Sequence, residues 1–244
     1  MRYGSATDRG LIRTNNEDCH AVVADGERLP CAFLVADGMG GHRKGELASA
    51  IAVEYASQRL MATLPGQVDP QRVEDELRDI VEKANVKVYL GSLESEANRG
   101  MGTTLTLAVL LDRALVVASV GDSRAYLQRG RSLMRVTVDH TVVQEMLDAG
   151  TIRPEDVRTH PKRHILTRAL GFPEYMTAEC ATVSVAKGDR ILLCSDGLHG
   201  MADDEEISTT LRRERTPQAA AQALVDLANR CGGEDNVTVV VAFV

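Results

Sequence analysis

Four aspartates lie at the edges of short apolar runs in this chain of 244 residues. Asp37, Asp122 and Asp196 each follow such a run closely, and Asp235 comes just before another. If the runs are buried strands of adjacent sheets, the four carboxylates converge on one rim of those sheets. A bare cluster of carboxylates repels itself, so some of its members would have to stay protonated.

Hard divalent cations would remove this repulsion, because Mg²⁺ and Mn²⁺ prefer carboxylate, carbonyl and water oxygens as ligands. Four aspartates and one backbone carbonyl could hold two ions. The alternative for any one aspartate is a turn or a helix cap, since Asp-Gly and Ser-Asp-Gly are common there. For a single aspartate we favour the cap, but four of them beside apolar runs favour a metal site.

The apolar runs that must position these aspartates have the composition of buried strands. They are near-continuously apolar, which is typical of strands covered on both faces. The predicted strands cover residues 31–36, 104–111, 115–120, 190–194 and 236–244.

Three segments have the apolar spacing of helices. Asp69-Pro70 and Thr216-Pro217 each place a capping residue before a proline, which predicts a helix start, and Gly232-Gly233 predicts the end of the second of these helices. A third helix is predicted from about residue 46 to 60. Two long helices then follow each other between strands, unlike the alternation of a doubly wound sheet. On the third helix we expect one face to carry Leu47, Ile51 and Tyr55.

The size and composition predict one domain over residues 1–244. No segment has the Pro, Gly or Ser content of a linker, and the length is at the upper end of what one core serves. Apolar residues make up 44% of the chain but aromatic residues only 3%, so the core must consist of Val, Leu, Ile and Ala. Such a core suits helices and sheets packed in layers.

The charge and the cysteines exclude several classes of function. A formal net charge of −7 disfavours nucleic acid and anionic membranes as partners. No apolar run approaches the roughly 18 residues that cross a bilayer, and the first residues lack the apolar core of a signal peptide, so we expect a cytoplasmic protein. The five cysteines lie far apart without a C-x-x-C pair, which argues against disulfides and a thiolate zinc site.

Short motifs follow one another along nearly the whole chain. They are Arg13-Thr14-Asn15-Asn16-Glu17-Asp18, Asp37-Gly38-Met39-Gly40-Gly41-His42, Gly102-Thr103-Thr104, Gly121-Asp122-Ser123-Arg124-Ala125-Tyr126, Asp139-His140-Thr141, Ser195-Asp196-Gly197-Leu198 and Glu234-Asp235-Asn236. As an ordered set they resemble the metal-dependent protein phosphatases, the type 2C serine/threonine phosphatases in their short bacterial form. One Asp-Gly alone carries no such signal, whereas the ordered set is specific.

The resemblance implies an α+β fold, a four-layer α-β-β-α sandwich in which helices flank two central antiparallel β-sheets, with the metal site at one end. By position, Asp37, Asp196 and Asp235 are similar to the ligands of a first metal ion. Arg13 matches the phosphate-binding arginine of the family. These four residues are the implied catalytic set.

The resemblance also implies further ligands. Asp37 would bridge the first ion and a second, and Asp122 with Asp196 is similar to the pair that holds a weaker third ion in bacterial members. The surroundings of the second ion would be Asp37, the Gly38 carbonyl, Glu17 and Asp18. The implied cofactor is Mn²⁺ or Mg²⁺, as two ions with a weaker third.

The implied reaction is hydrolysis of phosphoserine and phosphothreonine on proteins, by in-line attack of a water that two ions share. No protein nucleophile is needed, in keeping with a chain without a Cys-x5-Arg loop or a Gly-x-Ser-x-Gly elbow. The implied partners are phosphorylated proteins and a cognate bacterial serine/threonine kinase, and we expect a monomer.

The chain departs from many eukaryotic members at the general acid, because Met39 stands where they have histidine. His42 is one candidate for that role, with helix capping as its alternative, and a water on a metal ion is another. Residues from about 140 to 171 resemble the family's mobile flap. Cationic side chains there would guide a phosphopeptide or, alternatively, form an ordinary solvated surface.

Other classes of function fit less well. Residues 37–41 lack the spacing of phosphate-cradling glycine loops, and no 12-residue calcium loop is present. The main competitor is a catalytically silent member of the fold that binds phosphoprotein, but no implied ligand of the first metal ion is missing. A phosphatase dedicated to one partner-switching regulator would usually carry a sensor domain, for which 244 residues leave no room.

Overall fold

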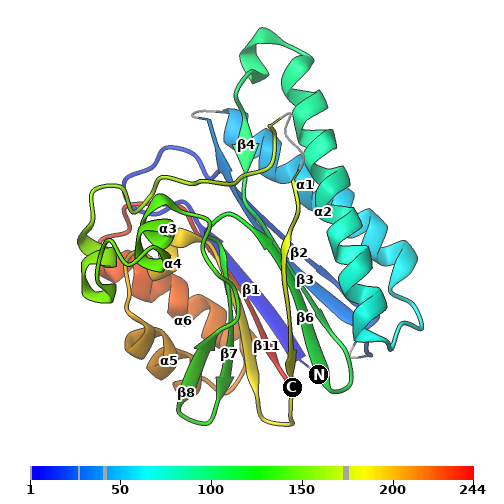
Figure 1. The fold of residues 1–244 in the computed structure, drawn as a ribbon. Helices are drawn as coiled ribbons and strands as arrows, with labels where there is room; N and C mark the ends of the chain where they lie inside the picture. The colour runs from blue at the N-terminus through cyan, green and yellow to red at the C-terminus, as the bar shows by residue number, and fades with distance from the viewer. Residues whose placement is uncertain (1, 27, 41–42, 173–175) are drawn as a thin grey trace.

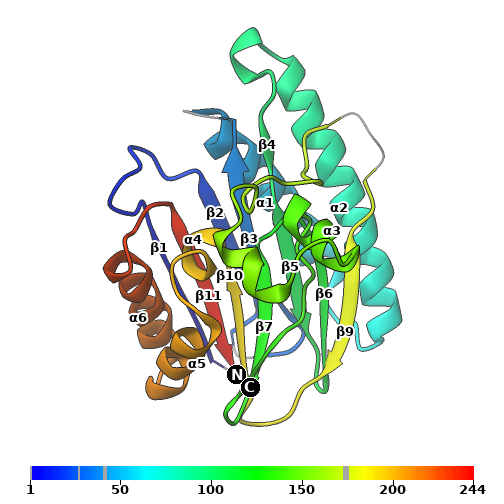
Figure 2. The ribbon, with the colours of Figure 1, turned by 60° about the vertical axis from the view of Figure 1, so that its left-hand side comes forward.

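The computed structural model describes residues 2–26, 28–40, 43–172 and 176–244. Two antiparallel sheets stack face to face in the middle of the molecule, and helices cover the outer face of each (Figure 1). In Figure 2, α5 and α6 lie outside one sheet and α1 and α2 outside the other. The prediction of a four-layer α+β sandwich is confirmed.

The first sheet joins the two ends of the chain, because its N-terminal strand pairs with its C-terminal one. Its strands, in spatial order, are β1 (Arg2–Asp8), β11 (Val237–Phe243), β10 (Arg190–Cys194), β7 (Arg124–Arg129) and β8 (Ser132–Arg135). Outside it lie α4 (Asp196–His199), α5 (Asp204–Arg213) and α6 (Pro217–Arg230).

The second sheet holds most of the central part of the chain. Its strands, in spatial order, are β2 (Asp18–Val23), β3 (Cys31–Met39), β5 (Leu105–Leu110), β6 (Ala114–Val120) and β9 (Glu179–Ser184), with β4 (Gly102–Thr103) on the end of β3. Outside it lie α1 (Arg43–Thr63) and α2 (Pro70–Leu93). The remaining elements are the short helices η1 (Glu96–Asn98), α3 (Val142–Asp148) and η2 (Pro154–Thr159).

Alternation along the central strands divides the core into three layers. On β3, Ala32, Leu34 and Ala36 face α1 and α2, whereas Phe33 and Val35 face the other sheet. Both sets are fully buried, because one face of the strand meets helices and the other meets a sheet. This explains why the strands that carry the aspartates are apolar without a break.

The predicted helix starts are confirmed. The Asp69 side chain accepts a hydrogen bond from the Gln71 amide at the start of α2, and Thr216 caps α6 through the amide of Ala219. After α6, Gly232 and Gly233 adopt positive φ, which ends the helix at low cost.

The predicted end of one strand is wrong, and of the three residues predicted on one face of α1, Ile51 and Tyr55 pack against the core whereas Leu47 is exposed. β3 continues past Ala36 to Met39, because β4 pairs with its last residues. On α1, Leu47 is 37% exposed and the buried face consists mainly of small residues. Helix α1 lies against β3 on this face, so the larger apolar side chain was a misleading guide to the side facing the core. The buried apolar residues of α1 are Ala48, Ala52, Val53, Ala56 and Leu60.

Among the described residues, none of the helices combines the length and the apolar content needed to span a bilayer. Among the described residues, no two cysteines form a disulfide. Cys31 and Cys194 are buried in strands, and burial raises the pKa of the Cys31 thiol to about 12.

We expect Phe33→Ala to cost about 3–5 kcal/mol of unfolding free energy, because the ring is fully buried between the two sheets and its removal leaves a cavity. Chemical denaturation measures this loss. The control is Phe172→Ala, at a ring 40% exposed, which should cost about 0.5 kcal/mol or less. Equal losses in the two variants would contradict the packing described for the central layer.

Candidate metal centre

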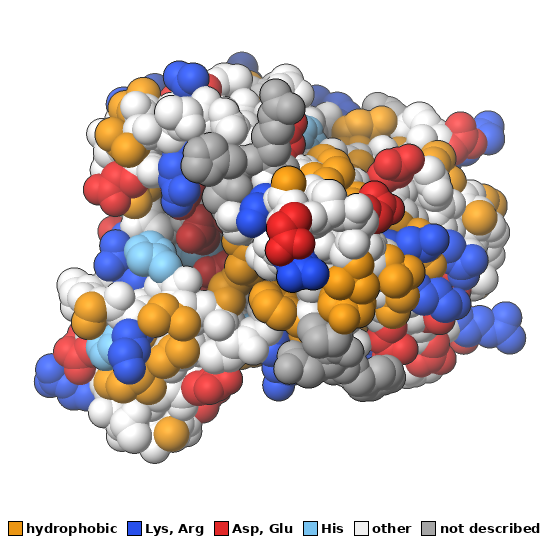
Figure 3. Space-filling model, turned by 90° about the horizontal axis from the view of Figure 1, so that it is seen from above, with side chains coloured by type: hydrophobic (Ala, Val, Ile, Leu, Met, Phe, Trp, Pro, Cys, Tyr) orange, Lys and Arg blue, Asp and Glu red, His pale blue; other side chains and the backbone are white. Residues whose placement is uncertain are grey.

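A cavity of about 550 Å³ opens at one end of the two stacked sheets. Seen from above, the molecule is hollowed here, with acidic side chains inside the hollow and a histidine at its edge (Figure 3). The cavity brings together residues far apart in the sequence. All but one of the predicted site residues line it, namely Arg13, Glu17, Asp37, Gly38, Asp122, Asp196 and Asp235.

The end of β3 holds Asp37 and Gly38 through backbone contacts. The Asp37 amide donates to Thr104 Oγ1 at 2.9 Å, and the Asp37 carbonyl accepts from the Thr104 amide at 2.8 Å. The Gly38 amide donates to the Glu17 carbonyl at 3.1 Å. A Cβ on Gly38 would lie 2.0 Å from the Gly45 carbonyl oxygen, so this position accepts glycine alone without a backbone shift. The Asp37 carboxylate is thereby aimed from a rigid strand end.

Asn236 fixes the loops that carry Asp235 and Glu17. Its side-chain amide donates to the carbonyls of Arg9 and Asn15, and its Oδ1 accepts from the Glu17 amide at 2.8 Å. Arg13, on the same loop, places Nη2 2.7 Å from Asp235 Oδ2. One neutral side chain therefore holds the N-terminal loop against the start of β11.

Asp18 lies behind the other carboxylates and does not line the cavity. It stands opposite Asp37 in the pairing of β2 with β3. Ser195 Oγ donates to Asp18 Oδ2 at 2.7 Å and accepts from the Thr238 amide at 2.9 Å. Ser195 thus ties the two sheets together next to Asp196. The other oxygen of Asp18, Oδ1, is buried and has no hydrogen-bond partner among the described residues.

The pKa values show the repulsion expected of a bare carboxylate cluster. Burial, and then the charges of Asp196 and Asp235, raises the pKa of Asp18 to about 7, although hydrogen bonds from Ser195 and Thr238 act in the opposite direction. Burial, and then the charges of other carboxylates, holds the pKa of Asp37 and of Asp122 well above the ordinary value. Burial also raises the pKa of Asp235. Positive charge that enters the cavity would lower these pKa values again.

Asp196 is the exception, and its neighbours explain why. Burial alone would raise its pKa, but a hydrogen bond with His164, the nearby His199 and a hydrogen bond from Asp37 bring its pKa below the ordinary value. Within the described part of the chain, Asp196 Oδ1 is buried without a hydrogen-bond partner.

This donor set fits a hard divalent cation. Among the described residues, no three His, Cys, Asp or Glu side chains already stand as ligands of one ion. Mg²⁺ does not need such a group, because it keeps several waters and is usually held by one or two carboxylates. Six carboxylates line the cavity and Asp18 lies behind them, and these groups provide the oxygen ligands and the negative charge that the cation requires.

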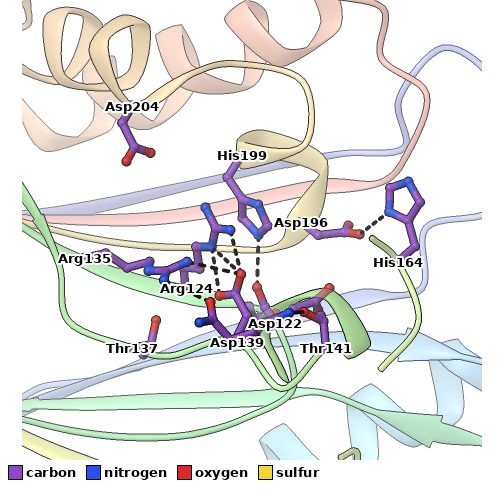
Figure 4. A network of polar contacts seen from close by, with 12 residues as sticks. Asp122, Arg124, Arg135, Thr137, Asp139, Thr141, His164, Asp196, His199 and Asp204 are labelled. Atoms are coloured by element: carbon purple, nitrogen blue, oxygen red, sulfur yellow. Dashed lines mark hydrogen bonds and ion pairs between the residues drawn. The ribbon is translucent and has the colours of Figure 1, made fainter. Parts of the chain in front are cut away.

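The structure adds residues that the sequence did not single out. His164, in the segment predicted to be the flap, lines the cavity, and its Nδ1 lies 3.8 Å from Asp196 Oδ2. His199 contacts the Asp122 carbonyl, and beside it Arg124 makes a paired hydrogen bond with Asp139 (Figure 4). The ordered motifs contain Arg124 and Asp139 but give no sign that they pair. His42, a predicted candidate for the general acid, lies outside the described residues.

The raised pKa values predict a pH dependence of the chain without metal. The ordinary pKa of Asp18 is 3.8 and its folded value about 7, so between these the folded chain retains a proton that the unfolded chain releases. The free energy of unfolding should therefore fall as pH rises from about 4 to about 7, and the raised pKa values of Asp37 and Asp122 act in the same direction.

Thermal unfolding in chelator at a series of pH values measures this effect. Asp18→Asn should flatten the dependence, because it removes one of the titrating groups. A melting temperature in chelator that rises with pH over this window would show that the carboxylates are not buried together as described.

Comparisons with known proteins agree with the fold and the motifs. A family model described as protein phosphatase 2C matches residues 13–238. The serine/threonine phosphatase stp of Listeria monocytogenes is 40% identical over 234 residues, which cover 96% of this chain and 92% of that protein.

Solved structures resemble the chain over its whole length. A serine/threonine phosphatase of S. agalactiae superposes with a TM-score of 0.92 at 31% identity, covering 100% of this chain and 99% of that one. The catalytic domain of serine threonine protein phosphatase PstP, solved in complex with two manganese ions, has a TM-score of 0.84 at 38% identity, covering 99% of this chain and 97% of that one. The chain therefore belongs to the protein phosphatase 2C family, as its ordered motifs indicate.

Proposed function

We propose that this chain hydrolyses phosphoserine and phosphothreonine on proteins with the help of divalent metal ions. The observation that carries the proposal is one cavity lined by six carboxylates and the Arg13 guanidinium. Carboxylates suit hard cations, and a guanidinium suits the oxygens of a phosphate. The serine/threonine phosphatase names of the relatives specify the substrate class.

The residues at the end of the sandwich divide into three groups that would hold Mn²⁺ or Mg²⁺. Asp37, Asp196 and Asp235 would hold a first ion. Asp37, the Gly38 carbonyl and Glu17 would hold a second, with Asp18 behind them acting through its contact with Ser195. Asp122 and Asp196 would hold a third. When bound, such ions supply a water of lowered pKa and neutralise charge on the phosphoryl oxygens.

Arg13 is the residue of this chain best placed to bind the phosphoryl group. Its side chain is 54% exposed and projects from the N-terminal loop to the rim of the cavity, where Asp235 holds it at 2.7 Å. This ion pair orients the guanidinium and leaves most of its surface open to a ligand. A guanidinium in this place meets the charge that develops on phosphoryl oxygens during transfer.

The segment from about 140 to 171 is proposed to be the flap of a single catalytic domain, residues 1–244. Its two ends are joined at the mouth of the cavity, where Thr141 bridges to Leu166. Arg158, Lys162 and Arg168 are exposed on it. In a chain of net charge −7, such side chains provide local attraction for an anionic phosphoprotein segment.

The proposed setting is a cytoplasmic monomer that opposes a cognate serine/threonine kinase, and it rests on the resemblance alone. A silent phosphoprotein binder is the alternative. The presence of Asp37, Asp196 and Asp235 around one cavity favours catalysis, because a binder has no need of them.

Hydrolysis of an aryl phosphate with Mn²⁺ tests the proposal. We expect excess chelator to abolish activity, and Asp37→Asn and Asp235→Asn each to lower kcat by about 10²-fold or more, since losing one stabiliser of transition-state charge costs this much. Asp112→Asn, at a side chain 90% exposed on the turn between β5 and β6, is the control and should leave kcat unchanged. Activity that survives chelation and both substitutions would refute the metal-dependent mechanism, and phosphopeptide binding by the parent without turnover would favour the silent binder.

Arg13→Ala should lower kcat/KM for the same substrate by about 10- to 100-fold, because it removes charge-assisted hydrogen bonds worth roughly 1.5–3 kcal/mol. Arg13→Lys should recover only part of the loss, since an ammonium cannot bind two phosphate oxygens as a planar fork does. Arg28→Ala, at a side chain 85% exposed, is the control. Steady-state kinetics that leave Arg13→Ala equal to the parent would exclude a role in phosphate binding.

A further inference from the structure

The turn that carries Asp122 is held by side chains from two other segments of the chain. Gly121, at φ +102°, packs against Thr104, where a Cβ would lie 2.5 Å from Cγ2. The Gly121 amide donates to Nδ1 of His140, and the Gly121 carbonyl accepts from the His140 amide at 2.9 Å. Ser123 Oγ lies 2.8 Å from Thr104 Oγ1. These contacts join the turn to β5 and to the base of the flap.

A third contact joins the same turn to the helix that begins with Asp196. Nε2 of His199 lies 3.0 Å from the carbonyl oxygen of Asp122 (Figure 4). A carbonyl oxygen can only accept, so the imidazole donates here and carries its proton on Nε2. The Nε2–H of His199 is therefore used by the Asp122 carbonyl.

The path of the chain explains why a side chain must supply this donor. The pairing of β7 with β10 stops at Arg124 and Cys194, because the chain after Cys194 turns into α4. Asp122 lies two residues beyond the last pair, where no partner strand continues. The His199 imidazole donates to the Asp122 carbonyl, in the place where the backbone amide of a neighbouring strand would otherwise donate.

The single turn of α4 thus carries the Asp196 carboxylate and also donates a hydrogen bond to the backbone of Asp122. Asp196 is the first residue of α4 and His199 the last. The carboxylates of Asp122 and Asp196 are close enough for the charge of Asp196 to act on Asp122. The two carboxylates repel each other, so the backbone of Asp122 must be held in place by other contacts.

We propose that His199 is a positioning residue that holds Asp122 beside Asp196 and thereby sets the affinity of this pair for a divalent cation. The inference rests on the proposed metal-dependent function and extends it, because it names a residue outside the implied ligand set. It concerns the third ion, for which Asp122 and Asp196 are the ligands. The affinities for the ions at Asp37 and Asp235 should depend on His199 far less.

Calorimetric titration of the full, metal-free chain with Mn²⁺ tests the proposal. We expect His199→Ala to weaken the weakest class of Mn²⁺ site by about tenfold or more and to leave the tighter sites within about twofold. His199→Gln should keep the weakest site within about threefold of the parent, because its side-chain amide can donate at the place of Nε2. Tyr126→Phe is the matched control, since Tyr126 belongs to the same polar network through Arg124 but does not touch Asp122.

The outcomes separate this inference from the proposed function. If the parent binds no Mn²⁺, the metal-dependent function itself fails. If the parent binds Mn²⁺ at two tight sites only, or if His199→Ala leaves every site unchanged, the role of His199 is refuted. If His199→Gln loses as much as His199→Ala, the ring acts by packing and not as a donor, which also overturns the proposal.

Nitrogen NMR of histidine-labelled protein without metal provides a readout that does not depend on any ion. The His199 signal is assigned by its loss in His199→Gln, and it should show a ring that carries a proton on Nε2. A ring protonated at Nδ1 could not donate to the Asp122 carbonyl, and it would contradict the inference.

Discussion

Mutual repulsion among buried carboxylates is the constraint on which the architecture of this end of the molecule depends. Asp18, Asp37 and Asp122 all have raised pKa values because burial and like charges act together on them. Such groups would move apart if their backbones were free. The fold prevents this by placing them at the ends of strands whose remaining residues are buried, so that leaving the rim would disrupt the core.

Neutral groups provide most of the restraint at the rim. Asn236 holds the N-terminal loop, Ser195 joins the two sheets behind Asp37, and Thr104 fixes the end of β3. Neutral donors and acceptors fix backbone positions without competing for charge with a bound cation. Cationic side chains are placed differently, since Arg13 lies at the rim and Arg124 is engaged with Asp139. The cavity can therefore keep a net negative interior and still present positive charge to a phosphate.

The elements of the fold could largely be predicted from local patterns. Capping by Asp69 and Thr216 and the apolar runs of the central strands depend on neighbours in the sequence, so the sequence shows them. The buried face of α1 could not be predicted in this way. It is lined mainly by small residues such as Ala48 and Ala52, and Leu47 is exposed, because the contact with β3 and not side-chain size decides which face is covered.

By itself, the sequence determined the family, the layered fold and the identity of the acidic residues at the strand ends, because these follow from an ordered set of motifs and from apolar runs. Only the tertiary structure decided how these residues are arranged. It placed Asp18 behind the cavity against Ser195, brought His164 to Asp196, and set His199 on the carbonyl of Asp122. Such contacts join strands, helices and loops that lie far apart in the sequence. The direction in which each side chain points is fixed by tertiary packing and not by spacing along the chain.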